Sequence, residues 1–106
     1  MTSRKGSKRL RTLALLAYER DLSRCIGAVQ NQITAWRGGE ITVWDVEQTI
    51  HEFHDKIARG LYRSYAQTDS ITAVAFGVAQ GVITLEDVPE EERGRIQEIA
   101  KAINRE

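Results

Sequence analysis

The sequence predicts an all-α protein of four helices, with an extra short turn possible, arranged as an orthogonal or antiparallel bundle. Three observations support this fold class. Apolar residues recur at spacings of three and four, only one proline occurs in 106 residues, and an eight-residue phrase suited to a helix end followed by a helix start occurs twice. We expect one domain, because a chain of this length builds a single core of modest size.

The first predicted element is a long helix from Lys8 to about Arg37. Its apolar seam alternates steps of three and four residues, as in a coiled coil, and consists of Leu15, Tyr18, Leu22, Cys25, Val29, Ile33 and Trp36. A helix of about 30 residues is about 45 Å long, whereas a compact domain of this size is only about 33 Å across. The helix should therefore protrude, unless a kink at Gly27 shortens it or a partner covers it.

The repeated phrase has the pattern G-x-I-T-[VL]-x-D-V and begins at Gly39 and again at Gly81. Glycine suits the left-handed residue that closes a helix, threonine suits the next N-cap, and the aspartate three residues later completes a capping box. The isoleucine before the box and the valine after it are placed to form a hydrophobic staple. The phrase predicts two helix-to-helix turns and carries no chemistry.

A second helix should run from the Thr42 cap to about Tyr65. Its predicted core stripe is Val43, Val46, Ile50, Phe53, Ile57 and Leu61. An amphipathic flank adjoins this stripe and consists of Trp44, Glu47, His51, His54, Tyr62 and Tyr65. Such a flank suits a semi-buried seam, either beneath the first helix or against a second subunit.

Two shorter helices should complete the fold. Asp69 or Ser70 is expected to cap a third helix from Ile71 to Gln80, which is apolar on every side and must therefore form the centre of the core. We expect the first two helices to form an antiparallel hairpin around it. Pro89 fits the first turn of a last helix, whose narrow isoleucine stripe predicts a peripheral position and which reaches about Asn104.

Charge is distributed unevenly, although the formal net charge is zero. Residues 1–7 are small, polar and basic and are predicted to form a flexible arm, followed by a single helical domain over residues 8–106. The first eleven residues contain no acid and five bases, namely Arg4, Lys5, Lys8, Arg9 and Arg11. Because these bases could hold phosphates by charge alone, the alternative function is a nucleic-acid-associated accessory protein.

Composition indicates a soluble cytoplasmic protein that does not span a membrane. No apolar run is long enough to cross a bilayer. Cys25 is the only cysteine, so no internal disulfide forms and a reducing compartment suits the chain. Its neighbours Leu22, Ile26 and Val29 are apolar, and we expect its thiol to be a small buried hydrophobe.

The sequence predicts no enzyme activity and no cofactor. It contains no nucleophile elbow and no phosphate-binding glycine loop, and both histidines fall within four residues of one helix. A second alternative is a helical metal-binding protein whose ligands come from Glu47, His51, His54 and Asp55. We expect ordinary hydrogen-bonded histidines instead, because the E-x-x-H spacing of di-metal bundles is missing.

The favoured interpretation is a small all-α interaction or regulatory module that acts as a homodimer, engages a second copy or another protein, and has no catalytic activity. This interpretation rests on the excess of apolar and aromatic surface on the first two helices. The predicted interface consists of Leu15, Tyr18, Leu22, Val29, Ile33, Trp36, Trp44, His51, Tyr62 and Tyr65.

Overall fold

The computed structural model describes residues 4–105, with side chains described from Lys8 onward. Over this range the chain is helical without a strand, which confirms the predicted all-α class. The elements are α1 (Arg4–Arg37), α2 (Val43–Glu52), the π-helical turn η1 (Phe53–Ala58), α3 (Arg59–Tyr65), α4 (Ser70–Ala79), the 3₁₀ turns η2 (Leu85–Asp87) and η3 (Glu90–Glu92), and α5 (Arg93–Asn104). Because α2, η1 and α3 follow one another without a break, we call them together the second rod.

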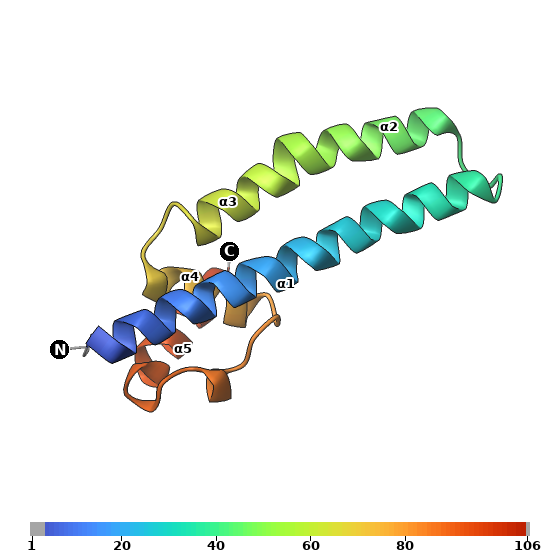
Figure 1. The fold of residues 1–106 in the computed structure, drawn as a ribbon. Coiled ribbons are helices and arrows are strands. Elements are labelled where there is room, and N and C mark those ends of the chain that lie inside the picture. Colours follow the sequence, from blue (N-terminus) through green and yellow to red (C-terminus); the bar gives the residue numbers. More distant parts are fainter. Residues whose placement is uncertain (1–3, 106) are drawn as a thin grey trace.

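The chain forms a long antiparallel hairpin with a packed head at its open end (Figure 1). α1 and the second rod are the two arms of the hairpin. In the head, α4 packs against α1 and α3, and α5 packs against α4. The molecule measures 55 × 27 × 23 Å, and its Cα radius of gyration is 16.5 Å, compared with about 13 Å for a compact domain of this length. The hairpin therefore protrudes, as the length of the first helix predicts, and α1 stays helical through Gly27.

α1 begins earlier than the sequence pattern indicates. Helical backbone starts at Arg4, so residues 4–7, which the sequence analysis assigns to the arm, belong to α1. Residues 1–3 lie outside the described part of the chain.

The apolar third helix is the centre of the head. Ala73, Val74 and Ala75 of α4 have no exposed surface. However, α4 lies at the open end of the hairpin, between α1, α3 and α5, and the hairpin does not enclose it. The prediction that the last helix is peripheral was wrong, because Ile96 of α5 is fully buried against this core.

Both copies of the repeated phrase form the capping box that their residues predict. Gly39 and Gly81 take left-handed backbone angles, with φ of 79° and 75°. The backbone N–H of Thr42 donates to the Asp45 carboxylate (N to Oδ2, 2.9 Å), and that of Thr84 donates to Asp87 at the same distance. The second box begins only a 3₁₀ turn, because Pro89 holds the residue before it in extended backbone and so ends the helix.

The π-helical turn η1 sets which side of the second rod faces α1. An α-helix advances by about 100° per residue, so without an interruption Leu61 would lie about 80° around the rod from Phe53. A π-turn adds about one residue to the helix, which brings Leu61 to within about 20° of Phe53 and Tyr65 to within about 30°. Leu61 and Tyr65 consequently reach the core of the head.

Two arginines of α1 fix the end of α4. Arg24 donates from Nη1 to the carbonyl oxygen of Gln80 (3.1 Å), and Arg20 donates to that of Val82 (2.9 Å). The carbonyl groups that follow the last turn of a helix have no partner within it, so these charged donors stabilise the turn and attach it to α1.

We expect Gly77→Ala to destabilise the protein by about 1–3 kcal/mol, the usual cost of overpacking a core. A Cβ at position 77 would lie 2.7 Å from the Cβ of Ala17 and 3.1 Å from Cδ1 of Ile83. The measurement is urea unfolding. Gly27→Ala is the matched control, since its Cβ would meet no atom within 4 Å. Equal stability of the two variants would contradict the close contact between α1 and α4.

We also expect acid to weaken the helix caps. Bonds from Thr42 lower the pKa of Asp45, and bonds from Thr84 lower that of Asp87. A carboxylate whose pKa is lower in the folded state stabilises that state above its unfolded pKa of about 3.9, and this contribution is lost as the pH falls through the folded pKa. The urea midpoint should therefore fall between pH 5 and pH 2, by less in the Asp45→Asn/Asp87→Asn variant. An equal fall in both proteins would rule out this role of the caps.

Candidate interaction face

The hairpin exposes large apolar side chains on both of its arms. On α1, Leu15 is 68% exposed and Ile26 is 50% exposed. On the second rod, Val43 is 48%, Ile50 49% and Tyr62 50% exposed. Isolated exposed apolar residues are common on proteins, so what matters is whether these five share one face.

Helix geometry places these five residues on the same side of the hairpin. At about 100° per residue, Leu15, Leu22, Ile26 and Ile33 fall within about 20° of one line along α1, and Val43 and Ile50 form a similar line on α2. Tyr62 continues the second line after the π-turn. On each arm, the line is rotated by about 50–60° around the helix axis from the residues that point at the other arm. The rotation has the same sense on both arms when each helix is viewed from its N-terminus. Because the two helices are antiparallel, equal rotations of the same sense place both lines on the same side of the hairpin.

We call this surface the hairpin face; it consists of the exposed Leu15, Ile26, Val43, Ile50 and Tyr62 together with the half-buried Leu22 and Ile33. The head does not cover it. The α1 residues buried in the head, such as Leu10, Ala17 and Asp21, lie about 120–160° away around the helix. The hairpin face is therefore open from the head to the tip, where the tip is residues 36–44.

The structure corrects the predicted core stripe of the second helix. Val46 and Leu61 are buried and Phe53 is half-buried, but Val43, Ile50 and Ile57 are each more than two-fifths exposed. The stripe is wider than the line along which two helices touch, and only one helix lies against this part of the rod. Ile26, Val43 and Ile50 are thus surface residues that the sequence analysis did not include in the interface.

The predicted interface residues are spread over several environments. Leu15, Trp44, His51 and Tyr62 are exposed, Trp36 is 37% exposed, and Tyr18, Leu22, Val29 and Ile33 are half-buried. Trp44 is 73% exposed and points away from α1, since it lies about 160–170° around α2 from Val46. Arg37 lies over the ring of Trp36, with its Cζ 5.8 Å from the ring centroid.

Tyr65 does not belong to an exposed seam, and the prediction that it does was wrong. Its side chain is 6% exposed and lies between Tyr18, whose ring it stacks on at 5.3 Å, and Phe76, whose ring it meets edge-on at 5.0 Å. Its hydroxyl donates to Oδ2 of Asp21 (2.8 Å). Tyr65 therefore ties the end of the second rod to α1.

Asp21 is the buried carboxylate at the junction of hairpin and head. It is 2% exposed, and besides Tyr65 it accepts a charged hydrogen bond from Nη2 of Arg24 (2.9 Å). Burial and the hydrogen bond to Asp21 raise the pKa of Tyr65 far above its ordinary value, so the phenol stays protonated. The two partners satisfy a carboxylate that would otherwise be costly to bury.

Cys25 lies one turn further along α1 and is half-buried. Burial, and then the charge of Asp21, raise the pKa of its thiol. Because the thiolate is the nucleophilic form, this environment disfavours reactivity at neutral pH.

The alternative metal site does not assemble. His51 lies 3.6 Å from Oε1 of Glu47 on the exposed side of α2, and both side chains are more than half exposed. Among the residues that the structure describes, no group of three histidine, cysteine, aspartate or glutamate side chains is placed to hold a metal ion. His54 and Asp55 are exposed on the same rod.

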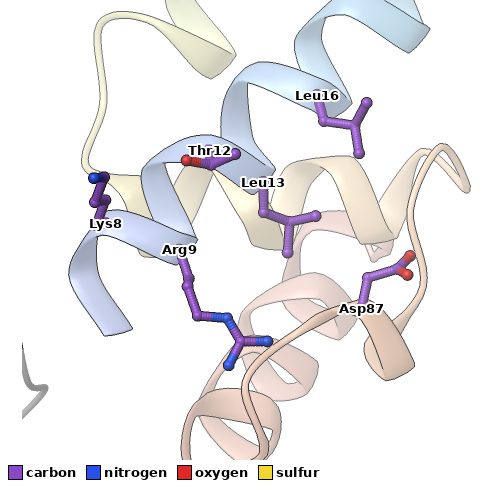
Figure 2. Close-up of a pocket in the computed structure, with 6 residues that line it drawn as sticks. All are labelled: Lys8, Arg9, Thr12, Leu13, Leu16 and Asp87. Carbon is purple, nitrogen blue, oxygen red and sulfur yellow. The ribbon is translucent and has the colours of Figure 1, made fainter. Parts of the chain in front are cut away.

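Two of the basic residues at the start of α1, Lys8 and Arg9, line a groove in the head. Lys8, Arg9 and Arg11 are exposed, whereas the side chains of Arg4 and Lys5 lie outside the described part of the structure. The groove has a volume of about 450 Å³ and a floor formed by Leu13 and Leu16. Figure 2 shows that the polar ends of Lys8, Arg9, Thr12 and Asp87 point in different directions around it, and Asp87 is already bonded to Thr84. These groups do not converge as the polar groups of an active site do.

Comparison with protein-family models, curated proteins and solved structures gives no match for this chain. Within the described range, no helix is both long enough and apolar enough to cross a bilayer.

We expect Tyr65→Phe to destabilise the protein by about 1–3 kcal/mol, because it removes one donor from a buried carboxylate and leaves its lone pairs unsatisfied. Urea unfolding measures the change. Tyr62→Phe is the matched control, since the same hydroxyl is lost there from a half-exposed side chain. If both variants unfold at the same urea concentration as the wild type, the bond from Tyr65 to Asp21 does not support the fold.

Proposed function

We propose that this protein is a small interaction module without catalytic activity, which forms a homodimer by burying the hairpin face of each copy against the other. The observation that supports this proposal is the row of exposed and half-buried apolar residues along both arms of a protruding hairpin. The largest apolar patch on a protein is often functional, and extended apolar surfaces mark interaction sites.

The size of the face fits a stable dimer. From Leu15 to Ile33 and from Val43 to Tyr62 each arm rises about 30 Å, and two adjacent helices are about 20 Å wide. The resulting area of about 600 Å² is close to the roughly 800 Å² that each partner of a specific complex buries. An area of this size exceeds what one short docked peptide would cover.

A second copy is the occupant that best suits this shape. Two antiparallel helices with a half-buried seam are half of a four-helix bundle, in which each helix buries a stripe against two neighbours. A second hairpin supplies the missing pair of helices and the same apolar composition. The charged residues nearest the two lines, Glu19 and Glu47, lie about 40° to one side of them, so an identical surface can approach with these carboxylates at its rim.

The proposed lack of catalytic activity is supported by the environments of the histidines, the thiol and the buried carboxylate. The two histidines lie on the exposed side of one rod, the thiol has a raised pKa, and the buried carboxylate is held by Tyr65 and Arg24. A cytoplasmic location belongs to the same proposal, because a half-buried thiol without a disulfide partner suits a reducing compartment.

We expect light scattering to give the mass of two chains for the wild type, and Ile50→Glu to weaken the dimer by about 100-fold or more. The dimer would bury two such glutamates, one from each copy, beside apolar side chains. Asn31→Glu is the matched control, because Asn31 is exposed on α1 about 160° from the hairpin face. Circular dichroism should show unchanged helix content in both variants. The mass of a single chain at millimolar wild-type concentration would refute the proposal.

A further inference from the structure

We propose that the two copies pair in an antiparallel orientation. The tip of each hairpin then lies over the base of the other, where the base is the end that joins the head, and α1 packs against α1 of the second copy. This inference rests on the proposed function and adds the orientation to it. It is carried by the opposite charges at the two ends of the hairpin, a property that the zero net charge of the chain hides.

Symmetry leaves two ways to stack two hairpin faces. A twofold axis along the helices places tip over tip and packs α1 against the second rod of the other copy. A twofold axis across the helices places tip over base and packs each arm against its own equivalent. Both arrangements bury the same apolar residues, so hydrophobic burial alone does not choose between them.

Charge does distinguish them. The base half of the hairpin comprises residues 8–24 and 56–65. Its acidic residues are Glu19 and Asp21, and its basic residues are Lys8, Arg9, Arg11, Arg20, Arg24, Lys56, Arg59 and Arg63. In the tip half, residues 25–55, the acids are Glu40, Asp45, Glu47, Glu52 and Asp55, and the base is Arg37. The base half is therefore positive and the tip half negative.

Stacking tip over tip would bring like charges together at both ends of the dimer. Stacking tip over base brings the negative tip of each copy to the positive base of the other. Like charges across an interface are costly, and complementary potentials both steer the encounter and fix its register. The acidic turns η2 and η3 belong to the head, on the side of α1 where Arg20 and Arg24 bond to head carbonyls. Without these two arginines the base half still has six basic residues against Glu19 and Asp21.

Antiparallel pairing also predicts which residues meet at the symmetry axis. The middle of the hairpin lies near residues 24–26 of α1 and near residues 53–54 of the second rod. Ile26 is half exposed on the hairpin face at this level, so the axis places Ile26 of one copy against Ile26 of the other. In the tip-over-tip arrangement Ile26 would instead face the second rod.

Two single-cysteine variants, each made in a Cys25→Ala background, test the orientation, one by a spin-label distance and the other by a disulfide cross-link. Spin labels at Gly38→Cys, an exposed tip residue, should be about 40 Å apart in the antiparallel dimer and about 20 Å apart if the tips coincide. Mild oxidation of Ile26→Cys should give a covalent dimer. A short label distance or no cross-link in a protein that still has the mass of two chains would overturn the orientation and leave the homodimer standing. A single-chain mass for the wild type would overturn both proposals.

Charge reversal gives an independent readout. Lys8→Glu/Arg11→Glu should weaken the dimer by about 10-fold, and adding Glu40→Lys/Glu47→Lys should restore most of the affinity. The matched control is Lys101→Glu/Arg105→Glu, which changes the net charge equally on exposed residues in the last turn of α5 and at its C-cap. Equal weakening by the control, or no recovery in the fourfold variant, would show that the two ends do not meet.

Discussion

A layer of two helices can bury only one narrow stripe on each helix, and this constraint governs the outer half of the molecule. In the head, α1 packs against both α3 and α4, and Ala17 has no exposed surface. Beyond Asp21 no residue of α1 is buried, because past Arg24 the second rod is the only described element beside it. The apolar arcs of both arms are nonetheless as wide as those of helices with two neighbours. The surplus width is the hairpin face.

The head and the hairpin are joined by small residues and one polar cluster. Ala17 and Gly77 let α1 and α4 approach closely, since the Ala17 side chain ends at its Cβ and Gly77 has no side chain. One turn further along α1, Asp21 accepts a bond from Tyr65 and fixes the end of the second rod. A hydrogen bond has a direction that apolar contact lacks, so this cluster defines the angle at which the two arms leave the head. The angle in turn holds both apolar lines on one side of the hairpin.

Local signals in the sequence predict where the helices begin and end, but not which of their faces are covered. Thr42 with Asp45 and Thr84 with Asp87 form the predicted boxes, and of the two caps expected for α4, Asp69 and Ser70, it is Asp69 that caps the helix. These features involve residues within four positions of each other, so they can be inferred from spacing alone. The exposure of Val43 and Ile50 depends on how many helices lie alongside them, which spacing does not record.

The π-turn explains why Tyr65 is buried in the head whereas Tyr62 is exposed on the hairpin face. Periodicity carried straight through Phe53–Ala58 places both tyrosines on an amphipathic flank, but one additional residue in the helix turns Tyr65 into the head and leaves Tyr62 on the hairpin face. The segment contains neither glycine nor proline that would predict an interruption. Packing supplies the reason for it, because Leu61 and Tyr65 contact the core only in the shifted register. The burial of Ile96 was also not predicted, because the width of an apolar stripe does not show how deeply a helix is buried.

On a surface of this kind, apolar burial determines the affinity of the dimer and charge determines its orientation. Burial of the hairpin face scales with area and is nearly the same for a partner that approaches in either direction, so it determines the strength of association and leaves the orientation open. Lysines and arginines at the base and carboxylates at the tip have the opposite property. In water each pair is worth little, yet reversing the direction of approach changes the sign of every interaction at once. A chain with zero net charge can therefore encode the orientation of its partner, provided that its charges are separated along a long axis, and the 55 Å hairpin supplies that axis.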